Sequence, residues 1–187
     1  MNYKPMLSFL SEDSIKAHNA YLKNLCSRHS VEEKSLPFIK GKSAFEISKM
    51  NIDKRVKSEI LPLLFDIELH CAYFDSFTEN PLPCREIKKY FSSEDDFCYQ
   101  ILTLARRTEY GFVYVVKNSR GEPEIKSTKE SQRLLYQAPL LALDVCEHAY
   151  FSDYGFEREE YLKRALSHLD LTKLFSSQKQ LDSGTQK

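Results

Sequence analysis

Residues 139–150 read PLLALDVCEHAY and join an apolar run to a carboxylate and an imidazole, Asp144 and His148, which lie four positions apart. The run is apolar at successive positions, which is typical of a strand that is buried on both faces. A buried carboxylate is costly unless a cation or hydrogen-bond donors compensate its charge. The stretch therefore predicts a buried strand that brings Asp144 and His148 to a dry metal site at its end.

The composition limits the partners of the protein. The chain has 187 residues, of which 42% are hydrophobic and 29% charged, enough for one globular unit built from two lobes. Its 27 lysines and arginines balance 27 aspartates and glutamates, so no net field attracts nucleic acid or an anionic membrane. We therefore expect neither a nucleic-acid partner nor a membrane partner.

The sequence also favours a cytoplasmic protein. No apolar run is long enough to span a bilayer, and residues 1–13 have neither the layout of a secretory signal nor that of a transit peptide. The cysteines are odd in number and form no Cys-x-x-Cys pair, so we expect reduced thiols. They are Cys26, Cys71, Cys84, Cys98 and Cys146.

The first half of the chain has helical periodicity. Residues 11–33 begin with SEDS, which offers helix-capping and first-turn acidic residues, and a short helix is expected at residues 43–50. A longer helix follows at residues 53–77, and Pro62 can kink or restart it. We expect these helices to form an α-helical hairpin domain, residues 1–79.

The second half combines helices with strands. After the turn-rich TENPLP at residues 78–83, residues 84–110 predict two more helices. GFVYVVK, residues 111–117, and IKST, residues 125–128, flank a turn and predict a hairpin. Residues 139–145 supply the third strand.

The order of these elements predicts an α+β fold. Helical spacing returns at residues 157–175, so helices are expected on both sides of the strands in the sequence. The predicted architecture is an N-terminal α-helical hairpin lobe followed by a C-terminal lobe, residues 80–175, with a small three-stranded antiparallel sheet flanked by helices. Residues 176–187 form a polar tail.

The histidines extend the predicted metal site. His70 lies in LLFDIELHCAYFDSF, an apolar helix, and His18 lies on the first helix. A single histidine on an apolar helix is usually a packed, hydrogen-bonded core residue. Three imidazoles and one carboxylate with an open position, however, suit iron or manganese, and zinc would accept them too. We expect one ion per chain, held by His18, His70, Asp144 and His148.

The longest motif resembles a known family. Residues 139–171, PLLALDVCEHAYFSDYGFEREEYLKRALSHLDL, are similar to the C-terminal signature of the iron/manganese superoxide dismutases, PLL-x-x-DVWEHAYY-x-x-Y-x-N-x-R-x-x-Y. YGFVYVVKNSRGEPEIKST resembles the family's SGWAWLV hairpin block that ends in ST, ELHCAYF resembles WNHTFYW, and LSEDSIKAH resembles ISAETIEYH. The resemblance covers residues 10–171. It implies that Asp144, His148, His70 and His18 are the metal ligands.

The first ligand can be aligned in two ways. KAHNAYLKNL also resembles the family's KHHQTYVTNL, and this register leaves Asp13 at the ligand position and keeps Tyr21 as the substrate-gateway tyrosine. The register that makes His18 the ligand puts Cys26 at the gateway position. It runs without a gap to GKSAFEI, which resembles GKSLEEI, and it completes the ligand set. His18 is therefore preferred, and both registers stay open.

The departures from the family pattern concern the surroundings of the metal. The chain has no tryptophan: Phe112 and Tyr114 replace the strand tryptophans, Cys146 replaces that of DVWEH, and Phe151 replaces the tyrosine that ends HAYY. Cys146 is expected to be a small apolar filler rather than a redox centre. The outer glutamine of the family has two possible places. Asp66 occupies one, and Ser131, with Gln132 beside it, occupies the other.

Two functions follow from the resemblance. The first is a superoxide dismutase that converts superoxide to oxygen and hydrogen peroxide at a mononuclear iron or manganese site. The second is a catalytically weak or inactive protein of the same fold that is kept for a structural or assembly role. The retained ligands favour the enzyme, whereas the altered surroundings favour the second function.

The resemblance also implies a homodimer. In the family, the glutamate of DVWEH reaches across a two-fold axis to a metal-bound histidine. Here Glu147 would contact the partner subunit's His148 and fix the orientation of that ring. The plain alternative is an ordinary exposed glutamate.

Overall fold

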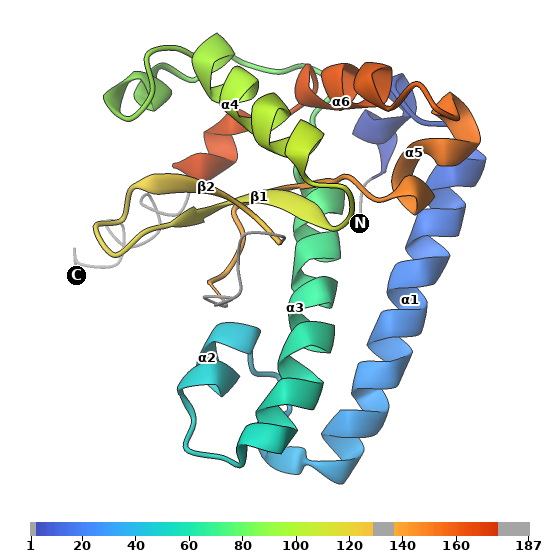
Figure 1. The fold of residues 1–187 in the computed structure, drawn as a ribbon, viewed down its shortest axis with the longest axis vertical. Helices are drawn as coiled ribbons and strands as arrows, with labels where there is room; N and C mark the ends of the chain where they lie inside the picture. The colour runs from blue at the N-terminus through green and yellow to red at the C-terminus, as the bar shows by residue number, and fades with distance from the viewer. Residues whose placement is uncertain (1–2, 129–136, 176–187) are drawn as a thin grey trace, which may run out of the picture.

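The computed structural model describes residues 3–128 and 137–175 (Figure 1). Its N-terminal part is helical, as predicted. Two long helices, α1 and α3, run side by side, and the short helix α2 lies beside α3 at the end of the pair that is remote from the sheet. The bounds are α1 (Glu12–Ser35), α2 (Ala44–Lys49) and α3 (Lys54–Asp75), with short 3-10 helices at Lys4–Ser8 and Pro37–Ile39.

Side chains at the helix starts explain where these helices begin. Ser11 accepts a hydrogen bond from the backbone N–H of Ser14 at 3.2 Å and starts α1. Ser43 and Glu46 form a reciprocal capping box at α2. The carboxylate of Asp53 accepts from Arg55 N at 2.7 Å and starts α3, which continues through Pro62.

The C-terminal part contains a three-stranded antiparallel sheet in the order β2-β1-β3, which confirms the predicted α+β fold. In β1, Phe112 pairs with Asp144 of β3, and Val115 pairs with Ile125 of β2. The sheet lies between α3 on one side and α4 on the other (Figure 1). The bounds are β1 (Phe112–Lys117), β2 (Pro123–Ser127), β3 (Leu141–Asp144) and α4 (Glu94–Arg107).

Two details of the helices differ from the prediction. The first of the two helices expected within residues 84–110 is a short 3-10 helix, Arg85–Lys89, because Ile87 N already bonds Cys84 O three residues back. The helix expected at residues 157–175 divides into α6 (Arg158–Leu166) and the 3-10 helix Leu171–Leu174. The expected domain boundary after residue 79 stays a prediction, and the expected tail, residues 176–187, lies outside the described residues.

The predicted position of His148 at the end of the buried strand is wrong. Sequence analysis placed both Asp144 and His148 at the end of the strand, but β3 ends at Asp144 and His148 lies in the first turn of another helix, α5 (Glu147–Tyr154). The chain turns because one oxygen of the Asp144 carboxylate accepts from Cys146 N at 2.8 Å. Cys146 then begins α5 with an extended backbone.

Polar contacts fix α5 against the start of α1. The carboxylate of Asp153 accepts a hydrogen bond from Ser11 N at 2.7 Å, and the Tyr154 hydroxyl donates to Phe9 O. Both contacts join the C-terminal half of α5 to the residues that precede α1. They therefore set the position of His148 relative to that of His18.

Ser76 joins α3 to the sheet. This residue is fully buried just after α3, where its hydroxyl donates to Ala72 O at 2.6 Å and accepts from Ala142 N in β3 at 2.8 Å. One hydroxyl thus links the helix that carries His70 to the strand that ends in Asp144.

Among the helices of the described ranges, none combines the length and the apolar character that crossing a membrane requires.

We expect Ser76→Ala to lower the free energy of unfolding by about 1–3 kcal/mol, because Ala142 N–H would lose its buried acceptor. Ser58→Ala is the control, since Ser58 is an exposed serine of the same helix whose hydroxyl also donates to a backbone carbonyl, that of Arg55 at 2.7 Å. This control should change the stability by no more than about 0.5 kcal/mol. Urea denaturation measures both, and equal losses would contradict the role of Ser76.

Candidate metal centre

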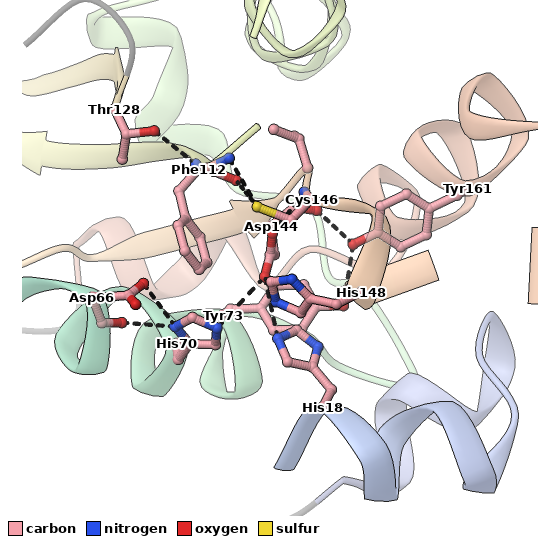
Figure 2. A network of polar contacts seen from close by, with 12 residues as sticks. His18, Asp66, His70, Tyr73, Phe112, Thr128, Asp144, Cys146, His148 and Tyr161 are labelled. Atoms are coloured by element: carbon pink, nitrogen blue, oxygen red, sulfur yellow. Dashed lines mark hydrogen bonds and ion pairs between the residues drawn. The ribbon is translucent and has the colours of Figure 1, made fainter. Parts of the chain in front are cut away.

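Four side chains from four elements meet where the helix pair reaches the sheet. They are His18 of α1, His70 of α3, Asp144 of β3 and His148 of α5, and one ligand atom of each lies within 4.8 Å of the others. Figure 2 shows the three imidazoles around the Asp144 carboxylate. The structure thus brings together all four residues that the sequence predicted as ligands.

The carboxylate of Asp144 is the centre of this group. Its Oδ2 lies 3.0 Å from His148 Nε2, 3.2 Å from His18 Nε2 and 3.7 Å from His70 Nε2. The carboxylate is fully buried, which by itself would raise its pKa. The hydrogen bonds and charges of His148 and His18 outweigh burial and hold the pKa of Asp144 well below its usual range.

The backbone fixes the proton of His70. Its Nδ1 lies 2.8 Å from the backbone carbonyl oxygen of Asp66 and 3.2 Å from Oδ1 of the Asp66 carboxylate. A carbonyl oxygen can only accept, so Nδ1 carries the proton and Nε2 of the neutral ring presents a lone pair towards Asp144. Burial lowers the pKa of His70, but Asp66 and Asp144 together raise it above its usual value.

The unpaired atoms of the group fit a metal ion. Nε2 of His18 and of His70 and Oδ2 of Asp144 are buried, and apart from the short contacts within the group none has a hydrogen-bond partner among the described residues. Burial lowers the pKa of His18 despite the nearby carboxylate, which favours its neutral, ligating form. Three imidazole nitrogens and one carboxylate oxygen form a donor set for iron, manganese or zinc. A cation here would satisfy all three atoms.

Two buried tyrosines that sequence analysis missed hold the end of β3. The Tyr161 hydroxyl donates to Asp144 O at 2.8 Å and accepts from the Tyr73 hydroxyl at 3.1 Å. Burial raises the pKa of both phenols, so both stay protonated. Two signals pointed to them: Tyr161 is the tyrosine of R-x-x-Y in the family pattern, and Tyr73 follows His70 by three residues on one helix.

The structure also bears on the two registers of the first helix. His18 belongs to the group, and Tyr21, three residues later on the same helix face, has its ring centroid 4.8 Å from that of His148 and 5.3 Å from that of His70. Asp13 is exposed in the first turn of α1, and Cys26 is exposed five residues beyond Tyr21. The helix therefore presents His18 and Tyr21 together, although the two registers treated them as alternatives.

A cavity of about 300 Å³ lies beside His70 and His148. Phe112 lines it, with its ring centroid 4.9 Å from that of His70, whereas Tyr114 is buried one layer further along β1 against Phe65. Cys146 also lines it and accepts a hydrogen bond from Gly111 N at 2.9 Å. Burial raises the pKa of Cys146 to about 12, so the cavity contains a neutral thiol.

The other residues that the sequence placed at or near the site lie in different surroundings. Asp66 lines the cavity, and its carboxylate approaches Nδ1 of His70. Glu147 is exposed at the start of α5, next to His148, whose side chain is 35% exposed and is the accessible member of the group. Ser131 and Gln132 lie outside the described residues.

The depressed pKa of Asp144 predicts a dependence of stability on pH for the metal-free protein. The carboxyl group of Asp144 loses its proton at a lower pH in the folded state than in the unfolded chain. The ionised carboxylate therefore contributes fully to the free energy of unfolding above its unfolded-state pKa of about 3.9, and this contribution is lost as the pH falls below that value. Asp144→Asn should therefore flatten the acid part of the profile of unfolding free energy against pH, measured by urea denaturation. The control Asp13→Asn should keep most of the slope. Identical profiles for wild type and Asp144→Asn would contradict this assignment.

Comparisons with known proteins agree with this geometry. A model of the C-terminal domain of the iron/manganese superoxide dismutases matches residues 83–176, half of the chain. The Mn/Fe superoxide dismutase of Rickettsia typhi is 33% identical over 86 residues, which cover 45% of this chain and 41% of that protein. That of Rickettsia prowazekii is 31% identical over 86 residues, with the same shares of 45% and 41%. The matched segment spans about two-fifths of these relatives.

The site is a superoxide-dismutase-like metal site, and the chain belongs to the iron/manganese superoxide dismutase family.

Proposed function

We propose that the protein converts superoxide to oxygen and hydrogen peroxide at a mononuclear iron or manganese ion, one per chain. The observation that carries this proposal is the group of three imidazole nitrogens around the buried Asp144 carboxylate, in a chain of this family. The two relatives described above are named superoxide dismutases, which supports the same activity.

In this proposal, four residues bind the ion and a fifth sets the proton position of one of them. His18, His70, Asp144 and His148 hold the ion, which supplies one-electron redox chemistry when bound. The backbone carbonyl of Asp66 keeps the His70 proton on Nδ1, so that Nε2 stays free to bind.

The cavity gives a small molecule access to the group, and Tyr21 lies at its wall. Burial and the charge of Asp66 raise the pKa of Tyr21, so its phenol keeps a proton beside the site at neutral pH. We propose Tyr21, rather than Cys26, as the gateway residue.

A second function has specific support. The cavity contains the carboxylate of Asp66 and the thiol of Cys146 at positions where the family pattern differs, and Phe156 is 94% exposed with its ring centroid 5.5 Å from that of Phe151. Exposed aromatic pairs of this kind are common at protein interfaces. These observations favour a weakly active or inactive protein of the same fold with a structural or assembly role.

Metal analysis combined with a superoxide-consumption assay separates the two functions. Protein expressed with both metals available should contain about one iron or manganese ion per chain and consume superoxide. His148→Ala should empty the site, because a donor set of four loses one nitrogen. The control His29→Ala changes a histidine of α1 whose Nε2 lies 3.7 Å from Glu33, outside the group, and it should keep the metal.

The possible outcomes differ clearly. Wild-type protein that contains neither metal would show that the ligand assignment is wrong. Wild-type protein that binds metal but consumes no superoxide would establish the second function instead. Loss of metal in both histidine variants would point to a general loss of folding rather than to the site.

We also propose a homodimer. Glu147 and Phe151 are exposed and lie four residues apart on one face of α5, and the exposed Phe156 follows this helix. Nε2 of His148 faces Asp144, so Nδ1 is the ring nitrogen available to a neighbour. The carboxylate of Glu147 could accept a hydrogen bond from the partner subunit's His148 and fix the tautomer of that ring.

Glu147→Ala should weaken the dimer and the metal site together. Loss of the bridge leaves an imidazole N–H without its acceptor in a partly buried site, at a cost of about 1–3 kcal/mol per site. The control Glu59→Ala removes an exposed carboxylate from α3 and should change neither property. Solution mass and metal content measure both effects. A monomeric wild type, or a Glu147→Ala variant that stays dimeric and fully metallated, would rule out the bridge.

The cytoplasm remains the proposed compartment. All five cysteines are free thiols, which suits a reducing environment. The equal numbers of acidic and basic residues support the proposal that neither nucleic acid nor a membrane is a partner.

A further inference from the structure

We propose that the cavity beside His70 and His148 binds a neutral small aromatic molecule that has a hydroxyl group, a ligand of the phenol class. The inference goes beyond the proposed function, because it rests on the walls of the cavity and requires neither a bound ion nor superoxide.

The cavity is larger than a diatomic molecule needs. Its volume is about 300 Å³. In another protein, an engineered apolar cavity of about 150 Å³ is enough to bind benzene. A six-membered ring with one substituent therefore fits into this space.

Two small side chains leave the space open. At positions 112 and 146 the family pattern has tryptophan, whereas this chain has Phe112 and Cys146, and both residues line the cavity. The sulfur of Cys146 lies 2.9 Å from Gly111 N, close to the backbone, and a free cysteine packs as a small apolar residue. The size of the cavity thus depends on residues in which this chain departs from the family pattern.

The walls suit a flat apolar ring. Most of the lining side chains are aromatic or aliphatic, as is typical of ligand pockets. Aromatic rings pack well against one another at centroid separations of about 4.5–7 Å, edge to face or offset. Figure 2 shows the Phe112 ring pointing from β1 towards α3, where Asp66 and His70 lie. The apolar part of the wall consists of Pro62, Phe65, Leu69, Tyr110 and Phe112.

The charge of the wall selects a neutral ligand that can donate a hydrogen bond. Asp66 is the one acidic residue among the described residues that line the cavity, and these include no lysine or arginine. Its carboxylate contacts Nδ1 of His70 at 3.2 Å and can accept further hydrogen bonds, for example from a ligand hydroxyl. A ligand carboxylate in the same place would face a like charge without a nearby cationic side chain. The wall therefore favours phenol over benzoate, which has the same ring and a negative charge.

The test measures the binding of phenol and of benzoate to the full chain by isothermal titration calorimetry, with and without bound metal. Wild type is compared with three variants. Cys146→Trp places an indole at the wall of the cavity, and Cys146→Ala is its control, because it removes the thiol and keeps the space. Asp66→Asn removes the charge and keeps an oxygen that can accept a hydrogen bond.

Phenol should bind wild type with a dissociation constant on the order of 0.1–1 mM, with or without metal, as is usual for a ligand of this size. Benzoate should bind at least about 10-fold more weakly, and Asp66→Asn should reduce this difference to about 3-fold or less. Cys146→Trp should weaken phenol binding by at least about 10-fold, whereas Cys146→Ala should change it by less than about 3-fold.

NMR spectra of the leucine methyl groups locate the ligand. Leu69 lines the cavity, so a bound ring should shift its methyl signals. Leu174 is also buried but does not line the cavity, and its signals should not move. This measurement needs only wild-type protein, so it decides the matter even where Cys146→Trp does not fold.

The outcomes separate this inference from the proposed function. Folded wild type that binds no phenol, binds benzoate as tightly, or keeps its Leu69 signals unchanged would overturn the inference, and so would unchanged phenol affinity in a folded Cys146→Trp variant. Protein that binds phenol in this cavity but contains no metal would overturn the proposed function alone. Metal-loaded protein that consumes superoxide and binds no phenol would overturn this inference alone.

Discussion

The burial of one carboxylate constrains the whole arrangement. Asp144 has no access to water, and its Oδ2 faces three imidazoles that have few other partners among the described residues. Such a group is stable only when the surrounding elements hold the imidazoles in place, because each lost contact leaves a polar atom unsatisfied in an apolar interior. The remaining polar contacts near the site serve this purpose.

Separate hydrogen bonds hold the elements that carry the three imidazoles and the Asp144 carboxylate. Ser76 ties β3 to α3, Asp153 ties α5 to the start of α1, and the pair Tyr73 and Tyr161 holds the backbone of Asp144. Arg158 adds hydrogen bonds to the carbonyls of Ala105 and Thr108 at the end of α4, at 3.1 and 2.6 Å. The four candidate ligands are thus held by hydrogen bonds that a change of one of these four side chains would leave intact.

Local signals in the sequence predicted the strands, the helix starts and the four side chains that the fold brings together as candidate ligands. The apolar run before Asp144 indicated a buried strand, and capping residues such as Ser11 and Asp53 indicated where helices begin. What could not be predicted depends on the three-dimensional arrangement. His148 lies on a helix because the Asp144 carboxylate turns the chain, and both carbonyl and carboxylate of Asp66 reach one ring nitrogen. No spacing in the sequence specifies such contacts.

The four candidate ligands come from segments that are far apart in the chain: His18 lies near its start, His70 in its second quarter, and Asp144 and His148 in its last quarter. An unfolded chain would have to close very long loops to bring them together, which is entropically costly. High-affinity uptake of an ion therefore requires a chain that has already joined its helical part to its sheet. Metal content in a preparation of this protein would then serve as a count of correctly folded molecules, independent of any enzymatic rate.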